Sequence, residues 1–163
     1  MLSFLLDGEA AVVAINWAPI IGGIGVALTV LLCGLGSAIG LKLTGTAAAA
    51  VLTEKPKKSG DALLLAVLPA TQGIYGFVLG LINYNKIVAL TGTQGWSLFI
   101  ACLPLMVVGM LSAILQGATS VSGLKALAKS DLSSGKLILY PAMVETYAIL
   151  ALVVSIMMTG NVG

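Results

Sequence analysis

Four long apolar runs separated by short polar stretches dominate this chain. They extend over about 17–50, 62–84, 96–128 and 137–159. A helix needs roughly 20 residues to cross the hydrocarbon core of a bilayer, and every run is long enough to do so. The pattern therefore predicts an all-α membrane protein with four transmembrane helices, of which the first and third are long enough to project beyond the lipid.

Composition supports lipid as the main solvent. Of the 163 residues, 59% are hydrophobic and only 9% are charged, whereas soluble domains carry about 25% charged residues. All basic residues are lysines and there is no histidine, so the chain offers no dense basic patch for nucleic acid and no Ser-His-Asp triad or histidine zinc site. Cys33 and Cys102 each lie alone in an apolar run, where we interpret them as small packing residues.

The polar stretches indicate the orientation in the membrane. The stretches 53–60 and 129–135 are rich in or flanked by lysine, whereas 83–95 contains only Lys86. The positive-inside rule therefore places the first and third loops in the cytoplasm and the middle loop and both termini outside. Trp17 and Trp96 fit an aromatic belt at the outer interface. The N-terminal stretch 1–11 lacks a basic region, so we interpret it as an interfacial lead-in and not as a cleaved signal peptide.

The chain repeats part of itself. Residues 69–75 (PATQGIY) match residues 141–147 (PAMVETY), and the Ser-Ala-Ile of 37–39 recurs at 112–114. The two offsets differ by three residues, so an insertion or deletion separates the matches. Their order predicts two antiparallel helical hairpins related by duplication in the same orientation.

The duplication divides the chain into hairpins at 1–86 and 87–163. The first apolar run is rich in glycine and contains the pair Gly36 and Gly40, spaced as GxxxG. In lipid, small residues let helix backbones approach closely. The pair therefore indicates either ordinary helix pairing within one molecule or the crowded inner wall of a ring of subunits.

Glu145 is the candidate for the chemistry, because it lies well inside the fourth apolar run. A charge within the bilayer costs at least a few kcal/mol, and such residues usually serve a site. The fourth run contains no lysine, so a proton or a bound cation must neutralise the carboxylate. This predicts a residue that alternates between a loaded and an empty state. The alternative is a permanently protonated glutamic acid that donates a hydrogen bond between helices.

Polar groups on two other runs are expected at the same depth as Glu145. Gln116 is the main polar residue in the middle of the third run, and Pro69, which has no N–H, frees a backbone carbonyl in the second. At about 1.5 Å per residue, these groups lie roughly 14–18 Å from the cytoplasmic end of their runs. Together with the Glu145 carboxylate, these oxygen groups would form a cage with one negative charge, which suits a monovalent hard cation such as Na⁺. The residues of the second run that share one helical face are Leu68, Thr71, Gln72 and Tyr75.

Over nearly its whole length the chain resembles the K, or c-type proteolipid, subunits of V-type rotary ATPases, especially the bacterial sodium-translocating branch. The segments 68–77 (LPATQGIYGF) and 142–150 (AMVETYAIL) carry the resemblance. It implies Na⁺ held by the Leu68 carbonyl, Thr71, Gln72, Gln116 and Glu145, with Tyr75 hydrogen-bonded to the carboxylate. Because Gly73 stands where the second hairpin has Glu145, it also implies one ion site per subunit.

The resemblance further implies a rotor in a bacterial cell membrane. Identical subunits would form a ring in contact with lipid, a static membrane subunit would supply an arginine, and a central stalk would contact the cytoplasmic loops. The chain has no phosphate-binding loop and no organic cofactor motif, so it is not expected to be an enzyme by itself.

Two other functions stay open at this point. The same rotor could translocate H⁺, since relatives that do so keep the glutamate. A small four-helix cation or drug antiporter also has one membrane glutamate, but proteins of that kind resemble one another in carrying it in the first helix and in being rich in aromatic residues. Here aromatic residues make up 6% of the chain. A purely structural membrane protein would leave the depth-matched polar groups unexplained.

Overall fold

The computed structural model describes residues 15–131 and 133–162. The expectations for the N-terminal lead-in, 1–11, lie outside the described residues. Within the described residues the protein is entirely helical, without strands. Its elements are α1 (Ala18–Glu54), η2 (Pro56–Lys58), α2 (Ser59–Val67), η3 (Leu68–Ala70), α3 (Thr71–Ile87), α4 (Gln94–Lys129), α5 (Ser134–Leu137) and α6 (Leu139–Gly160).

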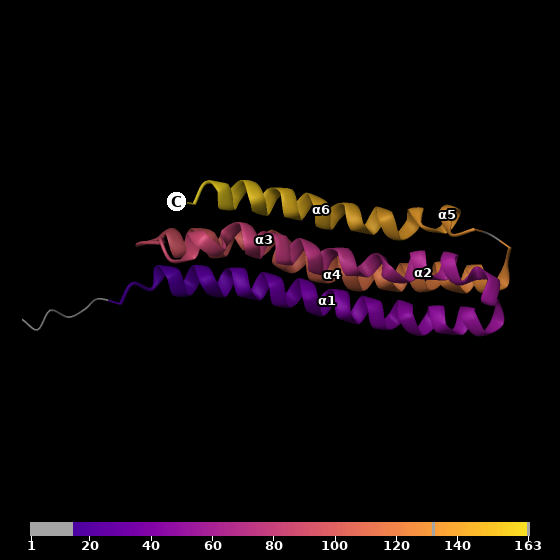
Figure 1. Ribbon diagram of the computed structural model, residues 1–163. Coiled ribbons are helices and arrows are strands. Elements are labelled where there is room, and N and C mark those ends of the chain that lie inside the picture. Colours follow the sequence, from indigo (N-terminus) through magenta and orange to yellow (C-terminus); the bar gives the residue numbers. More distant parts are fainter. Residues whose placement is uncertain (1–14, 132, 163) are drawn as a thin grey trace, which may run out of the picture.

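The helices lie side by side in an up-and-down bundle (Figure 1). The segment from η2 to α3 (Pro56–Ile87) acts as one span, so the described residues contain four helices that are long and apolar enough to cross a membrane. This confirms the prediction of four transmembrane helices. α1 and α4 contain 37 and 36 residues, or about 55 Å of helix, which exceeds the thickness of a bilayer with its headgroups.

The connections between the spans contain fewer residues than we predicted from the polar stretches of the sequence. Thr53 and Glu54 belong to α1, and the second span already begins at Pro56. α3 continues to Ile87 and α4 begins at Gln94, so a turn over 88–93 replaces the expected loop 83–95. Gly92 in this turn has a φ of +52°, a conformation that glycine adopts without steric cost.

Side-chain hydrogen bonds explain why polar residues of the middle stretch are helical. The Asn83 amide donates to the Leu79 carbonyl within α3, over 2.9 Å. The Lys86 ammonium donates to the Thr159 carbonyl of α6, over 2.8 Å. The Thr159 carbonyl lies near the end of α6, and the Leu79 carbonyl lies one turn before Asn83 within α3. Both polar side chains therefore bond to helical carbonyls and do not mark a loop.

Glycines bring α1 and α4 into close contact. A Cβ added at Gly36 would lie 2.6 Å from the Met110 carbonyl oxygen, and one at Gly117 would lie 2.7 Å from the Cα of Gly40. The GxxxG pair therefore serves pairing within one molecule. Gly34 and Gly45, on the same helix, have no atom within 4 Å of an added Cβ, so close packing within the chain does not require a glycine there.

Polar contacts at the loop end tie the two hairpins together. The Asp61 carboxylate accepts hydrogen bonds from the Ser134 hydroxyl, over 2.6 Å, and from the Ser134 backbone N–H, over 3.3 Å. The Lys55 ammonium donates to the Ser130 carbonyl over 3.0 Å. These contacts join the start of the second span to the loop before the fourth, and thereby help to hold α3 and α6 in register.

Candidate functional site

A short 3₁₀ turn interrupts the second span beside the candidate site. It covers Leu68–Ala70 and contains Pro69, as expected for a residue that lacks an N–H and breaks the α-helical hydrogen-bond pattern. The Leu68 carbonyl accepts two hydrogen bonds there, one from the Thr71 backbone N–H and one from the Thr71 hydroxyl over 3.1 Å. This carbonyl oxygen is therefore directed toward the Thr71 side chain.

Two glutamine side chains connect α3 to α4 inside the bundle. Gln72 and Gln116 are both 0% exposed, and the Gln72 side-chain N–H donates to the Gln116 Oε1 over 2.7 Å. The Thr71 hydroxyl donates to the Gln72 Oε1 over 3.3 Å. Burial of two amides in an apolar bundle is costly unless they are hydrogen-bonded, and here each amide has a partner.

Glu145 completes this chain of hydrogen bonds on α6. Its Oε1 accepts from the Tyr75 hydroxyl over 2.6 Å, and its Oε2 accepts from the Gln116 side-chain N–H over 3.2 Å. The Gln116 amide also donates to the Pro141 carbonyl over 3.1 Å. The carboxylate is half-buried, and it is oriented by donors from two other helices.

All six residues named from the sequence thus lie in one hydrogen-bonded chain that links α3, α4 and α6. The chain runs from the Leu68 carbonyl through Thr71 and the two glutamines to Glu145, with Tyr75 on the opposite carboxylate oxygen. It gathers carbonyl, hydroxyl, amide and carboxylate oxygens, which are the ligands that hard cations prefer. A terminal amide can turn to present either its oxygen or its N–H groups, so the two glutamines can supply oxygens to a cation.

Two serines at the site were missed as functional candidates from the sequence. The Ser112 hydroxyl donates to the Val144 carbonyl over 3.1 Å and lies 3.5 Å from the Gln72 amide nitrogen. The Ser37 hydroxyl accepts from the Gly73 N–H over 2.8 Å. A signal for Ser112 was available, because residues four apart share a helix face and Ser112 precedes Gln116 by four positions.

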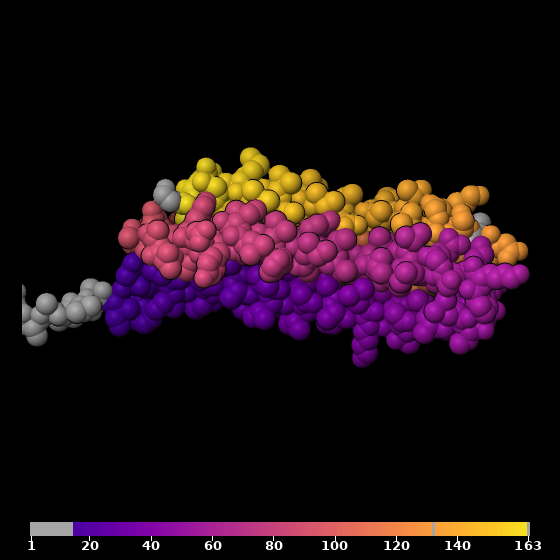
Figure 2. Space-filling model, in the orientation of Figure 1, coloured from indigo at the N-terminus to yellow at the C-terminus, as the bar shows by residue number. Residues whose placement is uncertain are grey.

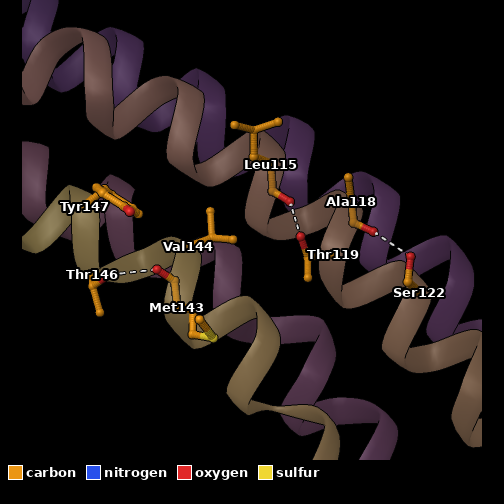
Figure 3. A pocket seen from close by; sticks show the side chains of 8 residues that line it. All are labelled: Leu115, Ala118, Thr119, Ser122, Met143, Val144, Thr146 and Tyr147. Atoms are coloured by element: carbon orange, nitrogen blue, oxygen red, sulfur yellow. Dashed lines mark hydrogen bonds between the residues drawn. The ribbon is translucent and has the colours of Figure 1, made fainter.

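A groove of about 810 Å³ lies next to the site, between α4 and α6 (Figure 3). The serine and threonine hydroxyl groups bond to their own helices: Thr119 donates to the Leu115 carbonyl, Ser122 to the Ala118 carbonyl and Thr146 to the Met143 carbonyl. The remaining lining is mostly apolar, and the residues are Leu115, Ala118, Thr119, Ser122, Met143, Val144, Thr146 and Tyr147. Because its hydroxyl groups do not converge, the groove is a poor candidate for an ion site.

Comparison with known proteins finds one matching family, that of the C subunit of ATP synthase. The family pattern matches twice, at residues 24–83 and 99–158, once in each predicted hairpin. The chain is 41% identical to the V-type sodium ATPase subunit K of Enterococcus hirae over 147 residues, which are 90% of this chain and 94% of that protein. It is 36% identical to the A-type ATP synthase subunit K of Methanocaldococcus jannaschii over 149 residues, which are 88% of this chain and 66% of that protein.

Proposed function

The chain belongs to the family of ATP synthase C subunits, as a multi-pass rotor proteolipid of the V-type and A-type ATPases, and we propose that it carries Na⁺ across the membrane at Glu145. Proteolipids of this kind translocate ions and do not bind the nucleotide that is hydrolysed. The antiporter alternative therefore no longer applies. What the proposal adds is the ion, the residues that hold it and the partners of the rotor.

The observation that carries the proposal is the hydrogen-bonded chain that ends on Glu145. A carboxylate that moves through lipid must be neutral, and Na⁺ neutralises it while five oxygen ligands replace the ion's hydration shell. We assign these ligands to the Leu68 carbonyl, Thr71, Gln72, Gln116 and Glu145. Tyr75 donates to the carboxylate oxygen at 2.6 Å, and in this proposal it orients Glu145 toward the ion.

Two observations favour Na⁺ over H⁺. A proton needs only the carboxylate, whereas here two buried amides, a hydroxyl and a carbonyl are connected to it. In addition, one of the relatives is named a sodium ATPase subunit and matches along nearly its whole length. In the loaded state the Gln116 amide would turn its oxygen toward the ion, and the hydrogen bond between the two glutamines would rearrange.

The transport cycle follows from the cost of an unpaired charge in lipid. Identical subunits form a ring that turns in a bacterial cell membrane, and each Glu145 meets two half-channels in a static membrane subunit. An arginine displaces the ion from Glu145. This arginine belongs to the static partner, because this chain has no arginine of its own. The lysine-rich ends of the spans face the cytoplasm and contact the central stalk, and both termini lie outside.

Modification with a hydrophobic carbodiimide tests the proposal, since the reagent reacts with protonated carboxylic acids in apolar surroundings. The assembled protein is treated at constant pH over a series of Na⁺ concentrations, with K⁺ keeping the ionic strength constant, and the modified residue is mapped by mass spectrometry. We expect modification at Glu145 that decreases as Na⁺ rises. Glu54, exposed at the end of α1, does not lie in apolar surroundings and should stay unmodified at every Na⁺ concentration.

The possible results separate the competing assignments. If Glu145 is modified to the same extent with and without Na⁺, the site carries H⁺ and the proposed ligands are wrong. If another carboxylate carries the Na⁺-sensitive modification, the assignment of the site to Glu145 is wrong.

A further inference from the structure

Ser112 lies on α4 at the place where α3, α4 and α6 meet. In Figure 2, α3 fills the space between α1 and α6, and most of α4 lies behind them. Ser112 is only 4% exposed, and it precedes Gln116 by one helical turn, so both side chains lie on the same face of α4. From this face the Ser112 hydroxyl contacts α6 at the Val144 carbonyl and α3 at the Gln72 amide.

The hydrogen bond to α6 decides what Ser112 can offer to α3. The hydroxyl donates to the Val144 carbonyl over 3.1 Å, and a serine hydroxyl has only one proton to donate. Its oxygen keeps lone pairs and lies 3.5 Å from the Gln72 Nε2. Toward Gln72, Ser112 is therefore an acceptor, which favours the N–H end of the amide at this place over its oxygen end.

The other contacts of Gln72 agree with this orientation. Its Oε1 accepts from the Thr71 hydroxyl over 3.3 Å, and its Nε2 donates to the Gln116 Oε1 over 2.7 Å. The amide oxygen thus faces Thr71, whose hydroxyl bonds to the Leu68 carbonyl, and we assign both of these groups to Na⁺. The opposite end of the amide faces two acceptors, Gln116 at close range and Ser112 slightly beyond the usual hydrogen-bond distance.

Ion binding would remove the closer of these two acceptors. In the proposed loaded state, Gln116 turns its oxygen toward Na⁺ and no longer accepts from Gln72. Gln72 is 0% exposed, and a buried N–H that loses its acceptor is destabilising. The Ser112 oxygen is within reach as a replacement, because a shift of about 0.5 Å would bring this contact to the usual length.

We propose that Ser112 is a positioning residue of the ion site, which accepts a hydrogen bond from Gln72 while Na⁺ is bound. It thereby holds the Gln72 oxygen toward the ion and leaves Gln116 free to turn its own. This inference rests on the proposed Na⁺ site. Its effect is confined to Na⁺, because in the described part of the chain the Glu145 carboxylate accepts from Tyr75 and Gln116 and not from Ser112.

Carbodiimide modification of the assembled protein separates this role from a structural one. Two values are measured for each variant: the Na⁺ concentration that half-protects Glu145 at constant pH, and the pH at which half of Glu145 is modified without Na⁺. In Ser112→Ala the first value should rise about tenfold, the effect of one buried donor left without an acceptor. The second value should not change, because a proton needs only the carboxylate.

Ser120→Ala is the matched control. Ser120 lies one turn beyond Gln116 on the same helix and is 0% exposed, and among the described residues its hydroxyl has no hydrogen-bond partner. Its removal should change neither value. Ser112→Thr enlarges the side chain but keeps a hydroxyl at the site, and it should bind Na⁺ more tightly than Ser112→Ala.

The results distinguish the ion site from the role of Ser112. If Na⁺ does not protect Glu145 in the original protein, the proposed Na⁺ site itself is wrong. If the original protein is protected and Ser112→Ala is protected at the same Na⁺ concentration, only the role of Ser112 is overturned. A shift of both values in Ser112→Ala, a similar shift in Ser120→Ala, or failure of Ser112→Ala to assemble would also overturn it, since Ser112 would then serve packing.

Discussion

The two hairpins place equivalent residues in different roles. In the second hairpin, α4 to α6, Glu145 carries the charge of the candidate site. At the matching position in the first hairpin, α1 to α3, stands Gly73, whose N–H donates to Ser37 over 2.8 Å. A Cβ at Gly73 would lie only 3.1 Å from the Ser37 hydroxyl oxygen. In the first hairpin, Ser37 therefore fills the space that a side chain at position 73 would need, whereas the second hairpin has a side chain at the matching position.

The equivalent tyrosines differ in the same way. Tyr75 of the first hairpin donates to Glu145, whereas Tyr147 of the second is 67% exposed at the groove beside α4. The first hairpin therefore contributes neutral oxygen and hydroxyl groups, and the second contributes the charge. In the proposed site, this division between two copies of one unit leaves a single carboxylate per chain to be neutralised in lipid, which lowers the cost of moving the site.

The largest expected effect comes from removal of the charge of the second hairpin. Glu145→Gln keeps the size of the side chain but has no carboxylate to bind a cation. We expect ATP-driven Na⁺ uptake into vesicles that contain the reconstituted complex to fall to background. Glu54→Gln, at the exposed end of α1, should transport at the original rate. Transport by Glu145→Gln above background would mean that the charge is carried elsewhere.

The next effect concerns the amide that links the hairpins. Gln116→Leu removes a donor to Glu145 and leaves the buried Gln72 amide without its 2.7 Å partner. The Na⁺ concentration that half-protects Glu145 from carbodiimide should rise at least about 10–100-fold, because the variant loses a proposed ion ligand that also holds Glu145 in place. Thr119→Val on the same helix is the control, because the Thr119 hydroxyl bonds only to its own helix. Similar shifts in both variants would contradict a specific role for Gln116.

The paired tyrosines allow a direct comparison of the hairpins. Tyr75→Phe removes a hydrogen bond to a charged group, which is worth about 1.5–3 kcal/mol, so the half-protecting Na⁺ concentration should rise at least about tenfold. Tyr147→Phe removes a hydroxyl at the equivalent position of the other hairpin and should leave the value unchanged. If the two variants behave alike, the division of roles between the hairpins is wrong.

The smallest effect is on stability alone. Gly73→Ala forces Ser37 to move by a few tenths of an ångström, and overpacking of this kind costs about 1 kcal/mol or somewhat more. The melting temperature of the assembled protein should therefore fall by a few degrees. Gly45→Ala, where an added Cβ meets no atom within 4 Å, should not lower it. A Gly73→Ala variant as stable as the original would show that the first hairpin has room for a side chain at this position.

Several features could be predicted from the sequence because they depend on local rules. The length of the apolar runs predicted four spans, and Pro69 predicted the break that the 3₁₀ turn Leu68–Ala70 makes. The division at residue 86, the membrane orientation and the ion ligands stay predictions. The lengths of the connections were wrong, because Asn83 and Lys86 are polar yet bond to helical carbonyls, which a count of polar residues does not distinguish from a loop.

By itself, the sequence determined that the chain spans a membrane, that its two halves are copies and that Glu145 is the one acid deep in an apolar run. These properties follow from composition and periodicity along the chain. Only the tertiary structure decided that Gly36 and Gly40 pack against α4, that Ser37 bonds to Gly73 and Ser112 to Val144, and that Lys42 lies on an exposed face of α1. The physical reason is that these facts depend on how helices far apart in the sequence approach one another, which local pattern does not specify.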